Sequence, residues 1–255
     1  MTKQPVLFIG HGSPMNAIED NAYTQSLAEI GKSIVQKPAA IMVVSAHWLT
    51  RGTYVSVTPK PETIYDFGGF PDELYQLKYP APGSPEFARE VIKLVPEILE
   101  DKDWGLDHGA WAVLKHIFPK ADIPVYQLSI DYHKPMQYHF DMSQRLKPLR
   151  EKGVLIIGSG NIVHNLRLWF SQTGSEPFDW AVEFDEWVKN KIIERDFQSL
   201  INYENQGKAA DLSVPTVDHY VPLLYCLGLV DDNESIVFTH EEVIGSMSMR
   251  SFRIG

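Results

Sequence analysis

Histidines supply the chemistry that this sequence offers most plainly. The chain has nine of them and a single cysteine. Three histidines follow apolar, β-branched runs that are typical of buried strands: His11 in GHGSP, His47 in SAHW and His164 in GSGNIVHN. The carboxyl ends of parallel strands form one edge of an α/β sheet, and ligands bind at that edge. We therefore expect these three imidazoles to lie close together.

Two further histidines belong with this group. His219 opens the apolar segment HYVPLLYCLGL, which is expected to return to the same edge, and His108 precedes another expected helix. Burying several imidazoles together is costly unless they are paired or bind a metal. Neutral imidazole suits zinc, copper, iron and nickel. The spacing thus predicts a histidine-rich metal site, and it leaves open whether that site serves metal hydrolysis or iron–oxygen chemistry.

The other four histidines and the cysteine are interpreted as structural. These histidines lie on expected helix faces or in polar loops without flanking glycines: His116, His133, His139 and His240. Cys226 lies within an apolar segment, where it is expected to pack as a small hydrophobic residue. A lone cysteine also excludes an intrachain disulfide and any multi-cysteine zinc or iron–sulfur site.

The elements that must position these side chains alternate along the chain. Short apolar runs predict strands at residues 6–9, 40–44, 124–128, 154–157 and 236–238, and apolar positions three and four apart predict helices over 87–98 and 180–192. This alternation predicts an α/β fold: one domain over residues 1–255, with a central, mostly parallel or mixed sheet flanked by helices on both faces. The Pro-, Gly- and Tyr-rich stretch 58–84 is expected to form a long, irregular excursion over one end of the sheet.

Composition and charge exclude several classes of function. The 255 residues carry a net charge of −10 and are 44% hydrophobic, which is typical of a globular protein without a basic stripe for nucleic acid. The first apolar run is too short for a signal peptide, and no stretch approaches the roughly 20 apolar residues of a bilayer span. We expect a cytoplasmic protein that binds neither nucleic acid nor membrane. The H-E-x-x-H, G-x-S-x-G, Walker and G-x-G-x-x-G motifs are absent.

Seven motifs, in order along nearly the whole chain, resemble those of a known enzyme family. They are GHGSPM, SAHW, FGGFP, DHGAW, GSGNIVHN, HYVPL and SMRSF. The chain is similar to the DODA-type extradiol aromatic ring-opening dioxygenases of the protocatechuate 4,5-dioxygenase superfamily. Within that family it resembles the bacterial 4,5-DOPA extradiol dioxygenase-like proteins.

The resemblance implies a single α/β catalytic domain with one divalent metal ion, Fe(II) for activity or Zn(II) as bound in purified protein. The positions that match the family's metal ligands are His11, His47 and His219. His164 matches a further histidine that is either a fourth ligand or an acid/base, and His108 matches a catalytic histidine on the substrate side. The broader protocatechuate class uses two histidines and a glutamate, whereas this chain has His219 at the third position.

The implied reaction inserts O₂ beside the two hydroxyls of a catechol such as L-DOPA and cleaves its ring at the 4,5 bond. His164 or His108 would take a proton from the catechol and later return one. Asp107 is expected to orient His108, and Asp218 is a further candidate partner of the site. The residues expected to contact substrate are Phe67, Phe70, Tyr220 and Arg250. For Arg250, pairing with a buried acid is the alternative to binding a substrate carboxylate.

Two other functions compete with this interpretation. A zinc hydrolase on a similar scaffold would need a positioned carboxylate base near the metal. A non-catalytic metal-binding or other binding protein would keep the fold with altered metal positions. The expected partners of the dioxygenase are a small catechol and O₂, and the chain is expected to be a monomer or a weak homo-oligomer.

Overall fold

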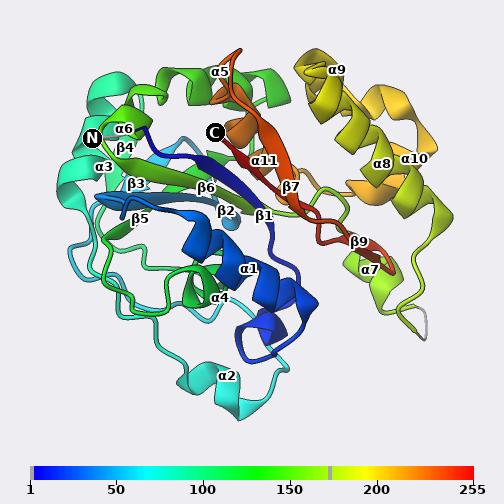
Figure 1. Cartoon of the computed structure of the whole chain (residues 1–255), viewed down its shortest axis with the longest axis horizontal. Coiled ribbons are helices and arrows are strands. Elements are labelled where there is room, and N and C mark those ends of the chain that lie inside the picture. The colour runs from blue at the N-terminus through cyan, green and yellow to red at the C-terminus, as the bar shows by residue number, and fades with distance from the viewer. Residues whose placement is uncertain (1–2, 172–173) are drawn as a thin grey trace.

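An eight-stranded mixed sheet runs through the centre of the computed structural model, which describes residues 3–171 and 174–255 (Figure 1). The strand order is β4-β3-β5-β2-β6-β1-β10-β7. Strands β5, β2, β6 and β1 pair in parallel, and β10 and β7 extend the sheet in antiparallel sense. The bounds are β1 (Val6–Gly10), β2 (Ala40–Thr50), β3 (Tyr54–Ser56), β4 (Leu99–Asp101), β5 (Val125–Asp131), β6 (Val154–Gly160), β7 (Ile236–His240) and β10 (Ser251–Ile254).

Helices cover both faces of this sheet, as predicted. Alternate residues of β1 face opposite layers: Val6 and Phe8 pack with α3, α5, α8 and α11, whereas Leu7 and Ile9 pack with α1 and α4. These helices are α1 (Ala22–Ser33), α3 (Pro85–Leu94), α4 (His108–Ile117), α5 (Met136–Arg145), α8 (Asp179–Glu194) and α11 (Val221–Gly228). The α/β fold class is thereby confirmed.

Shorter elements complete the chain. They are η1 (Pro14–Ala17), α2 (Asp72–Gln76), α6 (Pro148–Glu151), α7 (Leu166–Trp169), α9 (Phe197–Ile201), η2 (Tyr203–Gln206), α10 (Lys208–Ser213) and the hairpin β8 (Val243–Ile244) and β9 (Met247–Ser248). Within the expected loop 58–84, α2 is the single helix that the structure shows, so most of that stretch is irregular as predicted. In the two described ranges, no helix has the length and apolarity needed to cross a membrane.

The structure differs from the expectation in the length of α3 and in three unpredicted strands of the central sheet, β3, β4 and β10. The helix predicted over 87–98 ends at Leu94, because the ring of Pro96 disfavours helical backbone at Val95, which is extended at φ −135° and ψ 81°. Strand β10 was not predicted from its four residues. It lies between β1 and β7, and its antiparallel pairing with both strands makes the sheet mixed.

The register of the parallel strands aligns the ends that carry histidines. Gly10 of β1 pairs with Gly160 of β6, and Ser45 of β2 pairs with Ser159 of β6. His11 therefore follows β1 at the level where β6 ends. The β2–β5 register shifts between Val44 and Leu49, so His47 lies in an irregular part of β2 at the same edge.

A buried ion pair ties the N-terminal segment and the loop before β7 to α6. Arg150 is 1% exposed, and its Nη1 donates to Oε2 of Glu234 at 2.8 Å and to the Leu229 carbonyl at 2.8 Å. Its Nε donates to the Gln4 carbonyl at 2.9 Å. Burial alone would raise the pKa of Glu234, but hydrogen bonds from Arg150 and Lys3 outweigh it and lower the pKa from 4.5 to about 2.

Glu234→Gln is therefore expected to lower the free energy of unfolding by about 3 kcal/mol near neutral pH, because it leaves the Arg150 guanidinium buried without a counter-charge. The pKa of Glu234 is lower in the folded protein than in the unfolded chain. The stabilisation by its ion pair is therefore complete above about pH 4.5 and is lost as the pH falls toward 2. Urea denaturation at several pH values measures this effect. Glu97→Gln, which breaks an exposed pair with Arg145, is the matched control and is expected to cost less than about 1 kcal/mol. Equal losses in the two variants would contradict the prediction.

Candidate active site

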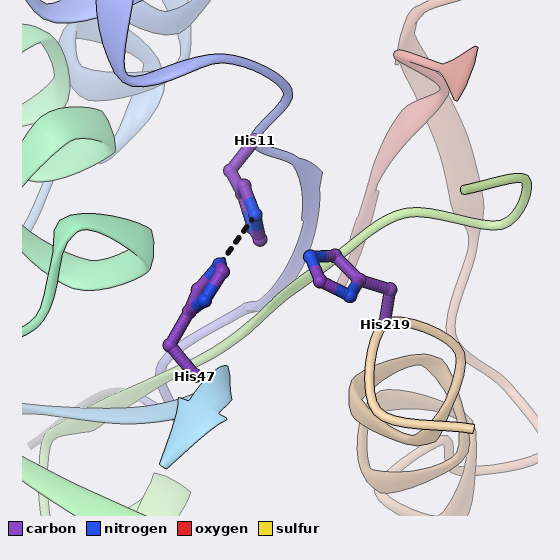
Figure 2. Close-up of side chains that lie close together, drawn as sticks. All are labelled: His11, His47 and His219. Carbon is purple, nitrogen blue, oxygen red and sulfur yellow. Dashed lines mark hydrogen bonds between the residues drawn. The ribbon is translucent and has the colours of Figure 1, made fainter. Parts of the chain in front are cut away.

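Three histidines from distant parts of the chain converge at the sheet edge where β1 and β6 end, beside the irregular part of β2. Figure 2 shows the rings of His11, His47 and His219 turned toward one another. Their ring centroids are 4.9 Å (His11–His47), 5.2 Å (His11–His219) and 5.0 Å (His47–His219) apart. One nitrogen from each ring lies within 4.8 Å of the other two. The structure thus brings together the three histidines that the family resemblance proposes as metal ligands.

A glycine makes this approach possible. The backbone amide of Asn161, just after β6, donates to the His219 carbonyl at 2.9 Å. A Cβ on the neighbouring Gly160 would lie 2.2 Å from that carbonyl oxygen, so a larger residue there would push His219 away from the edge of the sheet.

Hydrogen bonds from Nδ1 set the tautomer of His11 and of His219. Ser159 donates its hydroxyl proton to the Gly109 carbonyl at 2.6 Å, so its oxygen accepts from Nδ1 of His11 at 3.0 Å. Nδ1 of His219 bonds a carboxylate oxygen of Asp218. Nδ1 of His47 lies 3.4 Å from Oδ2 of Asp66. His11 and His219 carry their protons on Nδ1 in this arrangement, which leaves their Nε2 lone pairs available to a metal ion.

The donor set fits a divalent transition metal. Nε2 of His47 lies 3.0 Å from Nε2 of His11, the contact dashed as a hydrogen bond in Figure 2. Two ligands at about 2.1 Å from one ion lie roughly 3 Å apart, so these two nitrogens could both face one metal ion. Burial, followed by the neighbouring histidines, lowers the pKa of His11 and of His47 well below 6.5. Both rings are therefore neutral, as metal ligands must be.

Two more histidines flank the cluster. The His164 ring stacks on His219 with a centroid separation of 3.5 Å and an interplanar angle of 9°. Burial, and then His219, lowers the pKa of His164 to about 3, so the ring is a neutral proton acceptor at physiological pH. The His108 ring lies 4.0 Å from that of His47. All five histidines singled out from the sequence therefore meet at one edge of the sheet.

Asp66 is hydrogen-bonded to His108, and it was not among the residues predicted from the sequence. Its Oδ2 lies 2.8 Å from Nδ1 of His108, and its Oδ1 accepts from the His108 backbone amide at 2.9 Å. Asp107, which was expected to orient His108, instead caps α4 and accepts from Ser45 at 2.7 Å and from Gln127 at 2.7 Å. Burial raises the pKa of Asp107 to about 6. The only signal for Asp66 in the sequence is its position beside Phe67 in the aromatic and glycine-rich loop.

A cavity of about 810 Å³ opens in front of the histidines. Phe67 and Phe70 line it, as expected for substrate-contacting residues, and the Phe67 ring meets the His108 ring edge-on at 5.5 Å. Trp169 and Phe170, at the end of α7, also line it and were not predicted. The wall is largely apolar and aromatic, which suits an aromatic ligand.

Two residues expected at the substrate lie outside this cavity. The Tyr220 side chain is buried against Tyr203, and its hydroxyl donates to the Leu200 carbonyl at 3.0 Å. Arg250 is 2% exposed, and its Nε donates to Asp185 at 2.9 Å while its other nitrogens pair with Glu186 and Glu241. The structure thus corrects the substrate-binding interpretation of both residues, and Arg250 adopts the alternative, pairing with a buried acid.

The chain is similar over nearly its whole length to proteins of one enzyme family. Residues 5–249 match the family model described as the catalytic LigB subunit of aromatic ring-opening dioxygenase. A protein of Escherichia coli K12 named 4,5-DOPA dioxygenase extradiol is 47% identical, over 100% of this chain and 96% of its own. A Beta vulgaris protein of the same name is 38% identical, over 96% and 94%. The crystal structure of an uncharacterized E. coli K12 protein superposes with a TM-score of 0.86 at 44% identity, covering 99% of this chain and 100% of its own.

Proposed function

Since the chain belongs to the LigB family of aromatic ring-opening dioxygenases, we propose that it cleaves a catechol such as L-DOPA at the 4,5 bond, with a divalent metal held by His11, His47 and His219. The observation that carries this proposal is that one ring nitrogen from each of three histidines meets the others within 4.8 Å beside an aromatic-walled cavity. The names of the curated relatives support the choice of L-DOPA.

Fe(II) is the proposed metal of turnover. When bound, it supplies Lewis acidity toward the catechol hydroxyls and the one-electron chemistry through which O₂ reacts. Zn(II) fits the same ligands but is redox-inactive, so a zinc-loaded protein would bind catechol without opening its ring. Both atoms of O₂ enter the product, the ring bond beside the two hydroxyls breaks, and no external reductant is needed.

His164 and His108 are proposed to transfer protons, and Phe67 is proposed to contact the catechol ring. His164 and His108 flank the cluster on two sides, and either one can accept a proton from the catechol and return one during ring opening. Phe67 packs its ring edge-on against His108, so it can wall the catechol beside that proton acceptor. The apolar wall keeps bulk water from the reacting ring.

The hydrolase alternative is weaker. Asp66 and Asp218 are the carboxylates nearest the three histidines, but both are engaged by histidine Nδ1 atoms. Neither is free to act as the general base that metal hydrolysis needs.

The decisive experiment loads the protein with Fe(II) under anaerobic conditions, adds L-DOPA or caffeate and then admits O₂. We expect a yellow ring-opened product and uptake of one O₂ per catechol, with no turnover by the zinc-loaded protein. No consumption across a panel of catechols would refute ring opening.

Asp66 gives a further test of the site. Asp66→Asn removes the carboxylate that is hydrogen-bonded to Nδ1 of His108 and lies 3.4 Å from Nδ1 of His47, so we expect kcat to fall about 10- to 100-fold. Steady-state oxygen uptake measures this effect. Asp72→Asn removes an exposed acid on the neighbouring α2 and is expected to leave kcat unchanged. If the two variants behave alike, Asp66 does not position the histidines.

A further inference from the structure

We infer that the start of α4, defined here as its cap Asp107 and Gly109, positions two of the proposed metal ligands through one buried serine for each ligand. This inference rests on the three-histidine metal site of the proposed function, but it does not depend on the reaction at that site. It follows from two chains of hydrogen bonds that begin at the start of α4 and end at His11 and His47.

The two serines lie next to each other in the central sheet. Ser45 of β2 pairs with Ser159 of β6 in the parallel register, and both residues are 0% exposed. Paired residues on neighbouring strands point to the same face of a sheet, and both hydroxyls are hydrogen-bonded to the start of α4. Ser45 is two residues before His47 in the chain, and Ser159 contacts the His11 ring. One helix end therefore receives two hydroxyls, one beside each ligand.

The hydrogen bonds that lead to His11 have a fixed direction. The Ser159 hydroxyl donates its one proton to the Gly109 carbonyl at 2.6 Å. The serine oxygen can then only accept, so the 3.0 Å hydrogen bond with His11 is donated by Nδ1 of the ring. The Gly109 carbonyl thus orients the Ser159 hydroxyl in the way that keeps the His11 proton on Nδ1 and presents Nε2 to the site.

The hydrogen bonds that lead to His47 have the same form. Ser45 donates its hydroxyl proton to Oδ1 of Asp107 at 2.7 Å, and its oxygen accepts from the His47 backbone amide at 3.2 Å. Asp107 is itself held from a second strand, because Nε2 of Gln127 donates to its Oδ2 at 2.7 Å and Oε1 of Gln127 accepts from its amide at 3.0 Å. The β2–β5 register shifts around His47, so Ser45 supports the backbone of this ligand where the strand pairing is irregular.

A glycine allows the helix to approach the two strands this closely. A Cβ on Gly109 would lie 2.5 Å from the Ser45 hydroxyl oxygen and 3.1 Å from Cδ2 of His47. A residue with a side chain at this position would therefore displace both groups. Because the Asp107 carboxylate and the Gly109 carbonyl belong to one rigid helix end, any shift of α4 would alter the support of both ligands together.

The test measures the affinity for Zn(II) without turnover, by competition with a chromophoric chelator. Ser159→Ala removes the acceptor of a ligand's Nδ1 proton, so we expect the Kd to rise about 10- to 100-fold. Ser45→Ala acts through a backbone amide, so we expect a rise of about three- to tenfold, the effect of one ordinary hydrogen bond. Ser129→Ala is the matched control. It removes a fully buried hydroxyl of β5 that accepts from the Tyr54 amide at 2.8 Å, and the Kd should stay within about twofold of the unaltered protein.

Two further measurements separate positioning from a general loss of stability. Nitrogen-15 NMR of the metal-free protein should show His11 protonated at Nδ1, and Ser159→Ala should give a measurable share of the Nε2-protonated tautomer. Asp107→Asn keeps an oxygen for the cap of α4 but replaces one acceptor with a donor, so it should raise the Kd about as much as Ser45→Ala. Since Asp107 acts through Ser45, the double variant should bind within about twofold of the weaker single variant.

The outcomes distinguish this inference from the proposed function. If the unaltered protein binds no Zn(II), the metal site is refuted and the inference with it. If the serine variants lose affinity as expected but the iron form opens no catechol, ring opening fails and the positioning by α4 stands. If the protein binds Zn(II) and both serine variants bind it as Ser129→Ala does, or if His11 keeps its tautomer in Ser159→Ala, the positioning by α4 is overturned.

Discussion

His11→Ala and His47→Ala are each expected to lower metal content from about one ion per chain to less than about 0.1 after desalting, with loss of ring opening. Each substitution removes one of three neutral imidazoles that meet within 4.8 Å. Two histidine ligands without a carboxylate hold a divalent ion far more weakly than three. Elemental analysis of protein reconstituted with Zn(II), which needs no anaerobic handling, measures the content directly.

A control for this prediction uses a histidine outside the cluster. His133 is exposed and accepts from Nε of Arg51 at 3.1 Å, so His133→Ala should retain metal like the unaltered protein. Thermal unfolding with and without Zn(II) adds a second measurement. The unaltered protein should gain stability from the ion by mass action, and the His11 and His47 variants should not. Full metal content in a correctly folded His11→Ala protein would show that the three-histidine site is wrong.

His164→Ala is expected to keep most of the metal while kcat falls about 10²- to 10⁴-fold, the range for loss of a general acid/base. The His164 ring stacks on His219 and forms with it and Asp218 a second group, which shares only His219 with the set of three histidines. Its removal should therefore spare the three proposed ligands. Metal content and single-turnover oxygen uptake, measured on the same preparation, separate binding from chemistry.

The two proposed roles of His164 give opposite results in this experiment. If His164→Ala loses metal as His11→Ala does, His164 is a fourth ligand and the acid/base assignment fails. If it keeps both metal and turnover, His108 is the better candidate for proton transfer. His116→Ala is the control, because His116 is half-buried outside the cavity and its Nε2 lies 2.8 Å from the Asn16 carbonyl.

Much of the fold could be predicted because it depends on local patterns. Buried parallel strands are short, apolar and β-branched, and the five predicted runs all form strands of the central sheet. The apolar periodicity predicted a helix that runs past the end of α3, because Pro96 ends α3 at Leu94. It also failed to predict β10, because these four residues form a strand through their pairing with β1 and β7.

The partners of the site residues were less predictable. Asp107 is adjacent to His108 in the chain, but its position as the cap of α4 turns it toward Ser45 and Gln127. The acid that reaches His108 is Asp66, which lies 42 residues earlier. The side chain of an N-cap residue accepts from backbone amides in the first turn of its helix, as Asp107 accepts from the Ala110 amide. Its carboxylate is therefore not available to the ring of the next residue, His108.

The sequence by itself determined that five of the nine histidines belong to one edge of one α/β sheet and that the other four do not line the cavity. Position after a buried strand is a local property, and parallel strands bring their carboxyl ends together whatever their order. Tertiary packing alone fixes that Asp66 is the carboxylate at His108 and that Arg250 is neutralised by Asp185 and its neighbours. These pairings join segments up to 65 residues apart in the chain, and no local pattern specifies them.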